Sequence, residues 1–158
     1  MPTSESDCPA TDGLPVLGVT IVNYNTEQLT LNCVASLLAQ GIAAPEHICV
    51  VDNESPDGSG ARLATSLPAG VRLIHSGRNG GFGAGVNIGV AALDTPLVLV
   101  LNPDTYFLHN KVHVIRELFA KTSDLGVVGL KLVNPDGSLQ YSARRFYSLL
   151  DILARRSP

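Results

Sequence analysis

The stretch Pro96-Leu97-Val98-Leu99-Val100-Leu101-Asn102-Pro103-Asp104 combines an unbroken apolar run with an abrupt polar stop. The five apolar residues 97–101 predict a strand buried on both faces, as in a parallel sheet. Proline cannot donate to a sheet ladder, so the strand is expected to end at this point. Asp104 is therefore expected at the carboxyl edge of a buried strand, which is where open α/β sheets bind ligands.

Asp104 at such an edge has two interpretations. A carboxylate with an amide two residues before it suits a hard cation, Mg²⁺ or Mn²⁺, that also carries phosphate oxygens. The alternative is an ordinary polar turn between a strand and a helix, because polar residues fall at strand ends in any case. The stretch alone does not choose between them.

Strand and helix patterns alternate along the rest of the chain. Apolar segments predict strands over 16–22, 47–51, 71–75 and 125–133, and helices are expected after Asn25, over 60–66, over 87–93 and around 112–119. Asn25 or Thr26 would cap the first helix, with Gln28 reaching back, and Gly41 would end it. This alternation predicts an α/β fold, with a mostly parallel, Rossmann-like sheet and helices on both faces.

Three of the predicted strands end in side chains of one chemical type. These ends are Asn23-Tyr24-Asn25, Asp52-Asn53 and Asn102-Pro103-Asp104. Parallel strands place such ends on one edge, so two carboxylates and several amides should converge in one crevice. The pattern favours a nucleotide or sugar-phosphate site.

Composition narrows the class of protein. A chain of 158 residues that is 45% apolar and 16% charged is expected to form one globular domain. The net charge of −3 gives no global preference for nucleic acid. No apolar run approaches the ~18 residues of a membrane span. The polar start of the chain is not expected to be a signal peptide, and residues 1–14 are predicted to be a flexible tail.

The cysteines and the carboxyl-terminal segment carry further information. Cys8, Cys33 and Cys49 are too scattered for a disulfide framework or a zinc site, and Cys33 and Cys49 read as core thiols, which suggests a reducing compartment. Residues 141–158 hold four arginines against one aspartate, a net charge of +3. The basic segment 144–158 could face an anionic surface or a partner, or be an ordinary helix with solvated arginines.

The glycine-rich loop 77–85 is not a dinucleotide fingerprint, because its last glycine is missing and it follows the third strand. No P-loop occurs either. A turn at a helix N-terminus with Arg78 beside it suits a phosphate or a nucleotide base. The alternative is a tight turn that needs glycine for backbone reasons.

Two other patterns are weaker. His109 and His113 have metal-ligand spacing, but no carboxylate is placed as a third ligand, so an exposed helix start is the preferred interpretation. Asn134-Pro135-Asp136-Gly137 lies between apolar segments and predicts a hairpin turn.

Four ordered motifs carry a resemblance to a known family. The segments VTIVNYN (19–25), VVDNES (50–55), NGGFGAGVNIG (79–89) and LNPD (101–104) resemble family 2 glycosyltransferases, above all the bacterial rhamnosyltransferase-like branch. The segments GLKL (129–132), NPDGSLQ (134–140) and RRF (144–146) resemble the same branch. The likeness covers residues 15–146.

The resemblance implies a GT-A fold over residues 15–143, a nucleotide-sugar donor such as a dTDP- or UDP-sugar, and a Mg²⁺ or Mn²⁺ cofactor. It implies inverting transfer of a sugar, with rhamnose as one candidate, to a lipid-linked or saccharide acceptor in cell-wall or surface-polysaccharide assembly. Such a protein would work in the cytoplasm or at the inner membrane face. A homodimer is an open alternative.

Carried over residue by residue, the resemblance gives Asp52 to the base or ribose and Asp104 to the metal. Asn102 stands where the Asp-x-Asp motif has its first aspartate, which removes one charged metal ligand. The nucleotide site as a whole is predicted to comprise Asn23, Tyr24, Asn25, Asp52, Asn53, Arg78, Asn79, Asn87 and Asn102.

Family members continue well past this length, and their catalytic base lies in that later part. After Asp136 the only carboxylate here is Asp151, in no matching motif. The chain therefore reads as the donor-binding half of an enzyme, with no catalytic residue of its own. The rival hypotheses are a nucleotide-sugar-binding module without turnover and an unrelated doubly wound protein, such as a receiver-like or flavin domain.

Overall fold

The computed structural model describes residues 13–140, in two compact units that divide after Ser123. The first unit holds, in order, β1 (Leu17–Asn23), α1 (Glu27–Ala39), a 3₁₀ turn (Pro45–His47), β2 (Ile48–Asp52), α2 (Ser59–Ser66), β3 (Arg72–His75), α3 (Phe82–Ala91), β4 (Leu97–Leu101) and α4 (Val112–Lys121). The second holds β5 (Leu132–Val133) and β6 (Leu139–Gln140). The basic segment 144–158 and all but the last two residues of the predicted tail lie outside the described residues.

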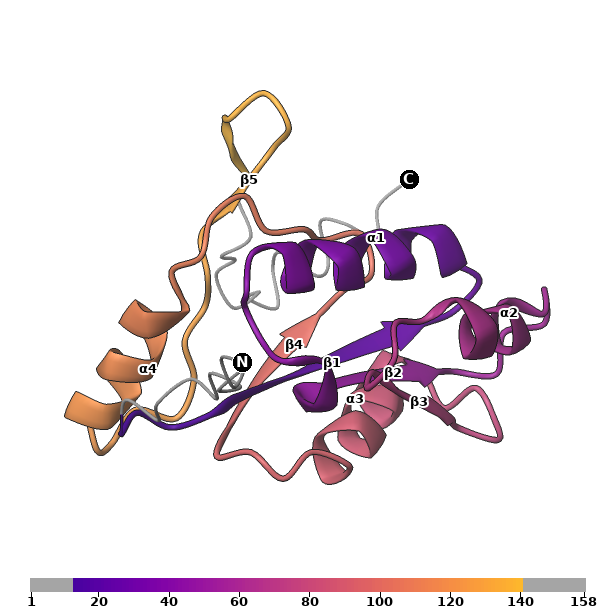
Figure 1. Cartoon of the computed structure of the whole chain (residues 1–158), viewed down its shortest axis with the longest axis horizontal. Helices are drawn as coiled ribbons and strands as arrows, with labels where there is room; N and C mark the ends of the chain where they lie inside the picture. Colours follow the sequence, from indigo (N-terminus) through magenta and orange to yellow (C-terminus); the bar gives the residue numbers. More distant parts are fainter. Residues whose placement is uncertain (1–12, 141–158) are drawn as a thin grey trace, which may run out of the picture. The chain divides into compact units, whose positions relative to one another are not determined.

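The first four strands form one parallel sheet in the order β3-β2-β1-β4 (Figure 1). In the register, Val19 lies opposite Ile48 on one side and opposite Leu99 on the other. β1 and β2 lie in the middle of the sheet and are buried at every position. Their apolar sequences suit strands packed on both faces. The predicted α/β fold with a parallel sheet is confirmed.

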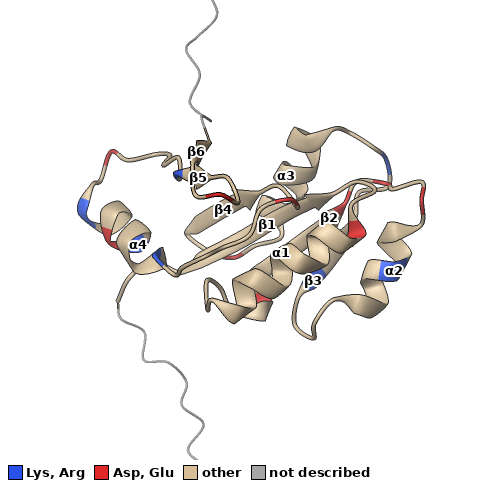
Figure 2. Ribbon diagram, turned by 90° about the horizontal axis from the view of Figure 1, so that it is seen from above, with Lys and Arg blue, Asp and Glu red and all other residues tan. Residues whose placement is uncertain are grey.

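Helices cover both faces of this sheet, as predicted. α1 and α2 lie over one face, and α3 lies on the other (Figures 1 and 2). The core includes Val19 and Ile21 of β1, together with Val34 and Leu37 of α1 and Leu63 of α2. Alternate residues of β1 point to opposite faces, so Thr20 and Val22 meet α3 instead.

β4 differs from the prediction of a strand buried on both faces. Its first three residues are only partly buried, and Val100 is 42% exposed. Among the described strands β4 pairs with β1 alone, so it forms an edge of the sheet. An unbroken apolar run therefore identified the strand correctly but not its burial.

α3 begins at Phe82, five residues earlier than predicted, so the glycines of the loop continue into the helix. A Cβ on Gly85 would lie 2.8 Å from Cγ1 of Val22, and one on Gly89 would collide with the Thr20 side chain. Glycine is needed at both positions because the helix backbone lies directly against β1. Part of the glycine-rich pattern is thus explained by helix–sheet packing.

The capping prediction for α1 is half right. Gly41 has a φ of +60° and ends the helix, with Gly41 N–H donating to Leu38 O and Ile42 N–H donating to Leu37 O. At the other end Thr26 occupies the N-cap position without a capping hydrogen bond. Its hydroxyl donates to Asn23 instead, and the Gln28 amide donates to Asn32.

Two other predictions are settled by the backbone. The strand predicted over 125–133 is wrong except for Leu132–Val133, since Gly126 and Gly129 favour no strand and the preceding residues have no pairing partner among the described strands. The hairpin turn at Asn134 is confirmed: it joins β5 to β6, and Gly137 has a φ of +81°.

We predict that Gly89→Ala lowers the free energy of unfolding by about 1–3 kcal/mol, because the added methyl group overpacks α3 against β1. Gly83→Ala is the matched control in the same helix, since a Cβ there meets nothing within 4 Å. That variant should raise the free energy of unfolding by about 0.5–1 kcal/mol. Urea denaturation measures both, and equal effects of the two changes would contradict the packing explanation.

Candidate functional site

The carboxyl edge of the sheet is organised by the buried side chain of Asn23, the last residue of β1. Its amide nitrogen lies 2.8 Å from Asp52 Oδ1 and 3.1 Å from both Ser55 Oγ and Ser59 Oγ. Its carbonyl oxygen accepts hydrogen bonds from the hydroxyls of Thr26 and Thr30. One side chain therefore connects β1 to β2, to both covering helices and to the loop after β2.

Asp52 ends β2 and is only 3% exposed. Its carboxylate accepts hydrogen bonds from the Asn23 amide at 2.8 Å and from the Ser55 hydroxyl at 2.6 Å. His75 Nδ1 lies 3.5 Å from the other carboxylate oxygen. A Cβ on Gly60 would collide with that oxygen, so the start of α2 is packed directly on Asp52.

Two opposing effects act on the pKa of Asp52. Burial alone would raise the pKa, but the hydrogen bonds from Ser55 and Asn23, with a smaller contribution from His75, outweigh it and hold the pKa below its ordinary value of 3.8. Asp52 is therefore charged at neutral pH. Its oxygens are already engaged by protein donors, so a direct contact with a base or ribose stays a prediction.

Asn53 and Asn79 form a second hydrogen-bonded group beside Asp52. The Asn53 amide donates to Asn79 Oδ1 at 3.0 Å, and its own carbonyl oxygen accepts from the Gly80 N–H at 3.3 Å. Gly81 N–H also donates to Asn79 Oδ1. These bonds fix the loop between β3 and α3 against the end of β2.

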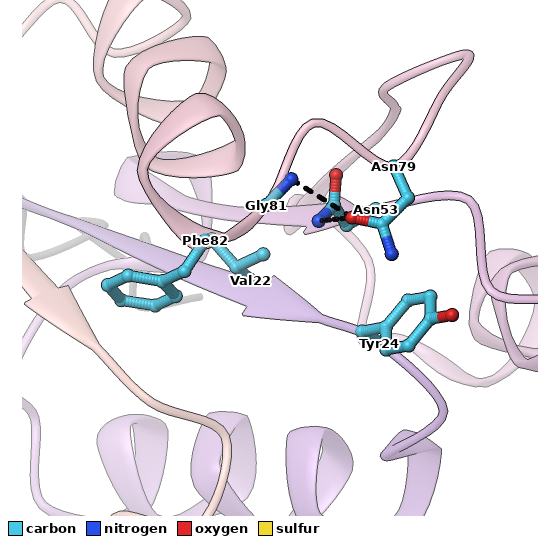
Figure 3. A pocket seen from close by; sticks show the side chains of 6 residues that line it. All are labelled: Val22, Tyr24, Asn53, Asn79, Gly81 and Phe82. Atoms are coloured by element: carbon cyan, nitrogen blue, oxygen red, sulfur yellow. Dashed lines mark hydrogen bonds between the residues drawn. The ribbon is translucent and has the colours of Figure 1, made fainter. Parts of the chain in front are cut away.

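These elements border an open pocket of about 270 Å³ (Figure 3). Its lining residues are Val22, Tyr24, Asn53, Asn79, Gly81 and Phe82. Tyr24 and Phe82 are 43% and 49% exposed. Figure 3 shows the Phe82 ring at the left end of the pocket and the Tyr24 ring at the right, with the Asn53 and Asn79 amides above Tyr24. Exposed rings beside fixed amides suit the stacking and edge recognition of a nucleotide base.

Other residues predicted for the nucleotide site do not line this pocket. Arg78 is exposed in the loop before the pocket, and its carbonyl oxygen accepts from the Ser76 hydroxyl. Asn25 directly follows Tyr24 in a left-handed conformation with a φ of +56°. Asn87 is exposed on α3 and is not among the lining residues. The site thus brings together Tyr24, Asn53 and Asn79, and the roles of the others stay predictions.

Asn102 and Asp104 follow β4 and are exposed. The turn packs on α1, where Cys33 Sγ lies 4.0 Å from Asn102 O.

Burial, with a contribution from the Asp104 charge, raises the pKa of the Cys33 thiol to about 12. Cys33 and Cys49 are both buried free thiols, as predicted.

A single exposed carboxylate cannot enclose a cation. Within residues 13–140 no three His, Cys, Asp or Glu side chains gather as a metal site. α4 begins at Val112, so His109 precedes the helix and His113 lies exposed in its first turn, which agrees with the preferred interpretation of an exposed helix start. Asp104 fits a divalent cation only where phosphate oxygens and waters complete the coordination.

Sequence reasoning missed two contributors to this edge. Phe82 lines the pocket but lies in a segment predicted only as a glycine-rich turn, and an aromatic residue between glycines is the signal that could identify it. Ser55 lies three residues after Asp52, a spacing that allows its N–H and hydroxyl to bond back to the carboxylate.

In the part of the chain that the structure describes, no helix is long and apolar enough to cross a membrane.

We predict that Asp52→Asn lowers the free energy of unfolding by about 1.5–3 kcal/mol at pH 7, the scale of hydrogen bonds to a charged group. Because the folded-state pKa lies below the unfolded one, the charged form stabilises the fold fully above pH 3.8, and this stabilisation disappears as the pH falls through the folded-state pKa.

Chemical denaturation from pH 7 to about pH 2.5 measures this dependence. The difference between parent and Asp52→Asn should shrink towards acid pH. Asp94→Asn, an exposed aspartate before β4, is the control and should change little at any pH. A difference that stays constant over the whole range would contradict the role given to the charge.

Comparison with known proteins agrees with this geometry. The family model described as glycosyl transferase family 2 matches residues 19–157. The chain is 30% identical over 151 residues to an N-acetylglucosaminyl-diphospho-decaprenol L-rhamnosyltransferase of Mycobacterium tuberculosis, covering 89% of this chain and 48% of that protein. It is also 30% identical over 130 residues to the succinoglycan biosynthesis protein ExoO of Rhizobium meliloti, covering 82% and 37%.

The fold is similar to that of S. aureus TarS. The TarS 1–349 structure matches with a TM-score of 0.53 and 20% identity, covering 67% of this chain and 32% of that one. Its complex with UDP matches with a TM-score of 0.54 and 19% identity, covering 72% and 38%. The chain thus spans less than half the length of these relatives. Its match to the family model over most of its length shows that the chain belongs to glycosyl transferase family 2.

Proposed function

We propose that this chain binds the nucleoside diphosphate of a nucleotide-sugar donor in the pocket between β1 and α3. The observation that carries the proposal is the pocket lining. Two half-exposed aromatic rings line the pocket together with side-chain amides that are held by hydrogen bonds. Free stacking surface next to oriented polar groups is what a planar, hydrogen-bonding base requires.

The relatives suggest the chemistry of the donor and acceptor. One is named as a rhamnosyltransferase acting on a diphospho-decaprenol-linked sugar, and a structural neighbour contains UDP. We therefore propose a UDP- or dTDP-sugar as donor, with rhamnose as the leading sugar, and inverting transfer to a lipid-linked saccharide acceptor in surface-polysaccharide assembly.

A nucleotide-sugar-binding module without turnover is the second candidate function. Among the described residues after α4, the carboxylates are Asp124 and Asp136. Hydrogen bonds from the Ser138 hydroxyl and N–H lower the pKa of Asp136, which makes it a weak base. Sugar transfer by the purified chain to a lipid-linked acceptor would exclude this second function.

A divalent cation would be held by Asp104, with Asn102 beside it, once the donor phosphates are bound. When bound, the cation would neutralise charge on the departing nucleoside diphosphate. Asp104 follows Pro103, whose ring restricts the backbone, so the carboxylate is presented by a stiff turn at the end of β4.

We predict that Phe82→Ala and Tyr24→Ala each weaken UDP or dTDP binding by about 1–3 kcal/mol, the usual contribution of one stacked aromatic ring. Isothermal titration calorimetry measures the affinities. Val90→Ala is the control, because Val90 lies on the same helix as Phe82, is 39% exposed and is outside the pocket lining. Parent-like affinity in both aromatic variants would overturn the proposed function.

We predict that the parent binds Mn²⁺ more tightly when a nucleoside diphosphate is present, and that Asp104→Asn loses this gain. The reason is that one carboxylate gives little affinity without phosphate oxygens. Mn²⁺ is titrated into the parent and into Asp104→Asn, each with and without UDP, which gives four combinations to compare. His109→Gln should behave like the parent, and equal Mn²⁺ affinity in all four combinations would assign Asp104 a purely structural role.

A further inference from the structure

Within residues 13–140, two residues other than glycine adopt left-handed backbone conformations, and both lie at the carboxyl edge of the sheet. Asn25 has a φ of +56° and Glu54 a φ of +60°. Such conformations are uncommon outside glycine and persist where the surrounding contacts hold them. Asn25 follows Tyr24 after β1, and Glu54 follows Asn53 after β2, so each lies next to a residue that lines the pocket.

The Ser55 hydroxyl lies between these two turns. It donates to Asp52 Oδ1 at 2.6 Å, and it accepts from the Asn25 N–H and the Asn23 side-chain amide, both at 3.1 Å. A hydroxyl has one donor and two acceptor positions, so its hydrogen-bonding capacity is used in full. The Ser55 N–H also donates to Asp52 Oδ2 at 3.3 Å.

We propose that Ser55 is a positioning residue for the pocket: its hydroxyl ties the turn that carries Tyr24 to the end of β2 that carries Asn53. The placement of Tyr24 relative to Asn53 then depends on this oxygen, in addition to the hydrogen bond from the Asn53 N–H to Asn23 O. The inference rests on the proposed nucleotide site, because a positioning role has meaning only where Tyr24 and Asn53 bind one ligand.

Ser59 offers a matched comparison. Its hydroxyl is buried and lies 3.1 Å from the same Asn23 amide, but it has no hydrogen bond to Asn25 among the described residues. Removing either hydroxyl takes a partner from Asn23. Only removal of the Ser55 hydroxyl releases the turn next to Tyr24, so the two variants separate positioning from general stability.

The test compares Ser55→Ala, Ser55→Thr and Ser59→Ala in the full chain, at a temperature where each is folded. UDP affinity by calorimetry should fall about fivefold or more in Ser55→Ala, the size expected for one lost hydrogen bond. It should stay at the parent value in Ser59→Ala and return towards it in Ser55→Thr. Ser55→Cys, close in size but weakly hydrogen-bonding, should shift affinity in the same direction as alanine.

A second readout needs no nucleotide. Amide hydrogen exchange at Asn25 should be faster in Ser55→Ala than in the parent and unchanged in Ser59→Ala. Equal exchange at Asn25 in Ser55→Ala and the parent would overturn the positioning role, as would equal losses of UDP affinity in Ser55→Ala and Ser59→Ala. Faster exchange in Ser55→Ala alone, with no UDP binding by the parent, would support the link between the turns and refute the proposed nucleotide site.

Discussion

The hydrogen bond between the buried side chains of Asn23 and Asp52 holds the carboxyl ends of the two central strands together. A charged aspartate that is 3% exposed requires donors from the protein, and Asn23 and Ser55 supply them. The same Asn23 amide reaches Ser59 of α2 and accepts from Thr30 of α1. The edge of the sheet is therefore a connected polar network, in which losing one member leaves others buried without partners. This network places the turns that border the pocket.

The pocket also depends on how closely α3 approaches β1. Gly85 and Gly89 allow the helix backbone to lie directly on Val22 and Thr20, where any side chain would collide. That contact fixes the start of α3 and, with it, the position of Phe82, which lines the same pocket as Asn53 and Asn79 (Figure 3). Two kinds of constraint thus build one site. A buried charge organises the ends of β1 and β2, and small residues bring the helix close enough to complete the lining.

The order of strands and helices could be predicted from the sequence, because apolar runs that end in Asn or Asp mark buried parallel strands and their ligand-binding edge. Asn53, Asn79 and Tyr24 were predicted for the site and lie together in the pocket. Burial of β4 was not predictable, since Val98 and Val100 look the same on a central and on an edge strand. The roles of Gly85 and Ser55 were not predictable either. Both depend on contacts across elements, Gly85 with Val22 and Ser55 with Asn25, which no local pattern encodes.

The most direct test of the central claim is nuclear magnetic resonance of the isotope-labelled full chain during titration with UDP and with dTDP. We predict that chemical-shift changes concentrate on the pocket residues, with the largest changes at Tyr24, Asn79, Gly81 and Phe82, because a stacked base alters the ring currents and amides closest to it. Changes confined to α4 or to the hairpin 132–140, or no changes at millimolar nucleotide, would contradict a nucleotide site between β1 and α3.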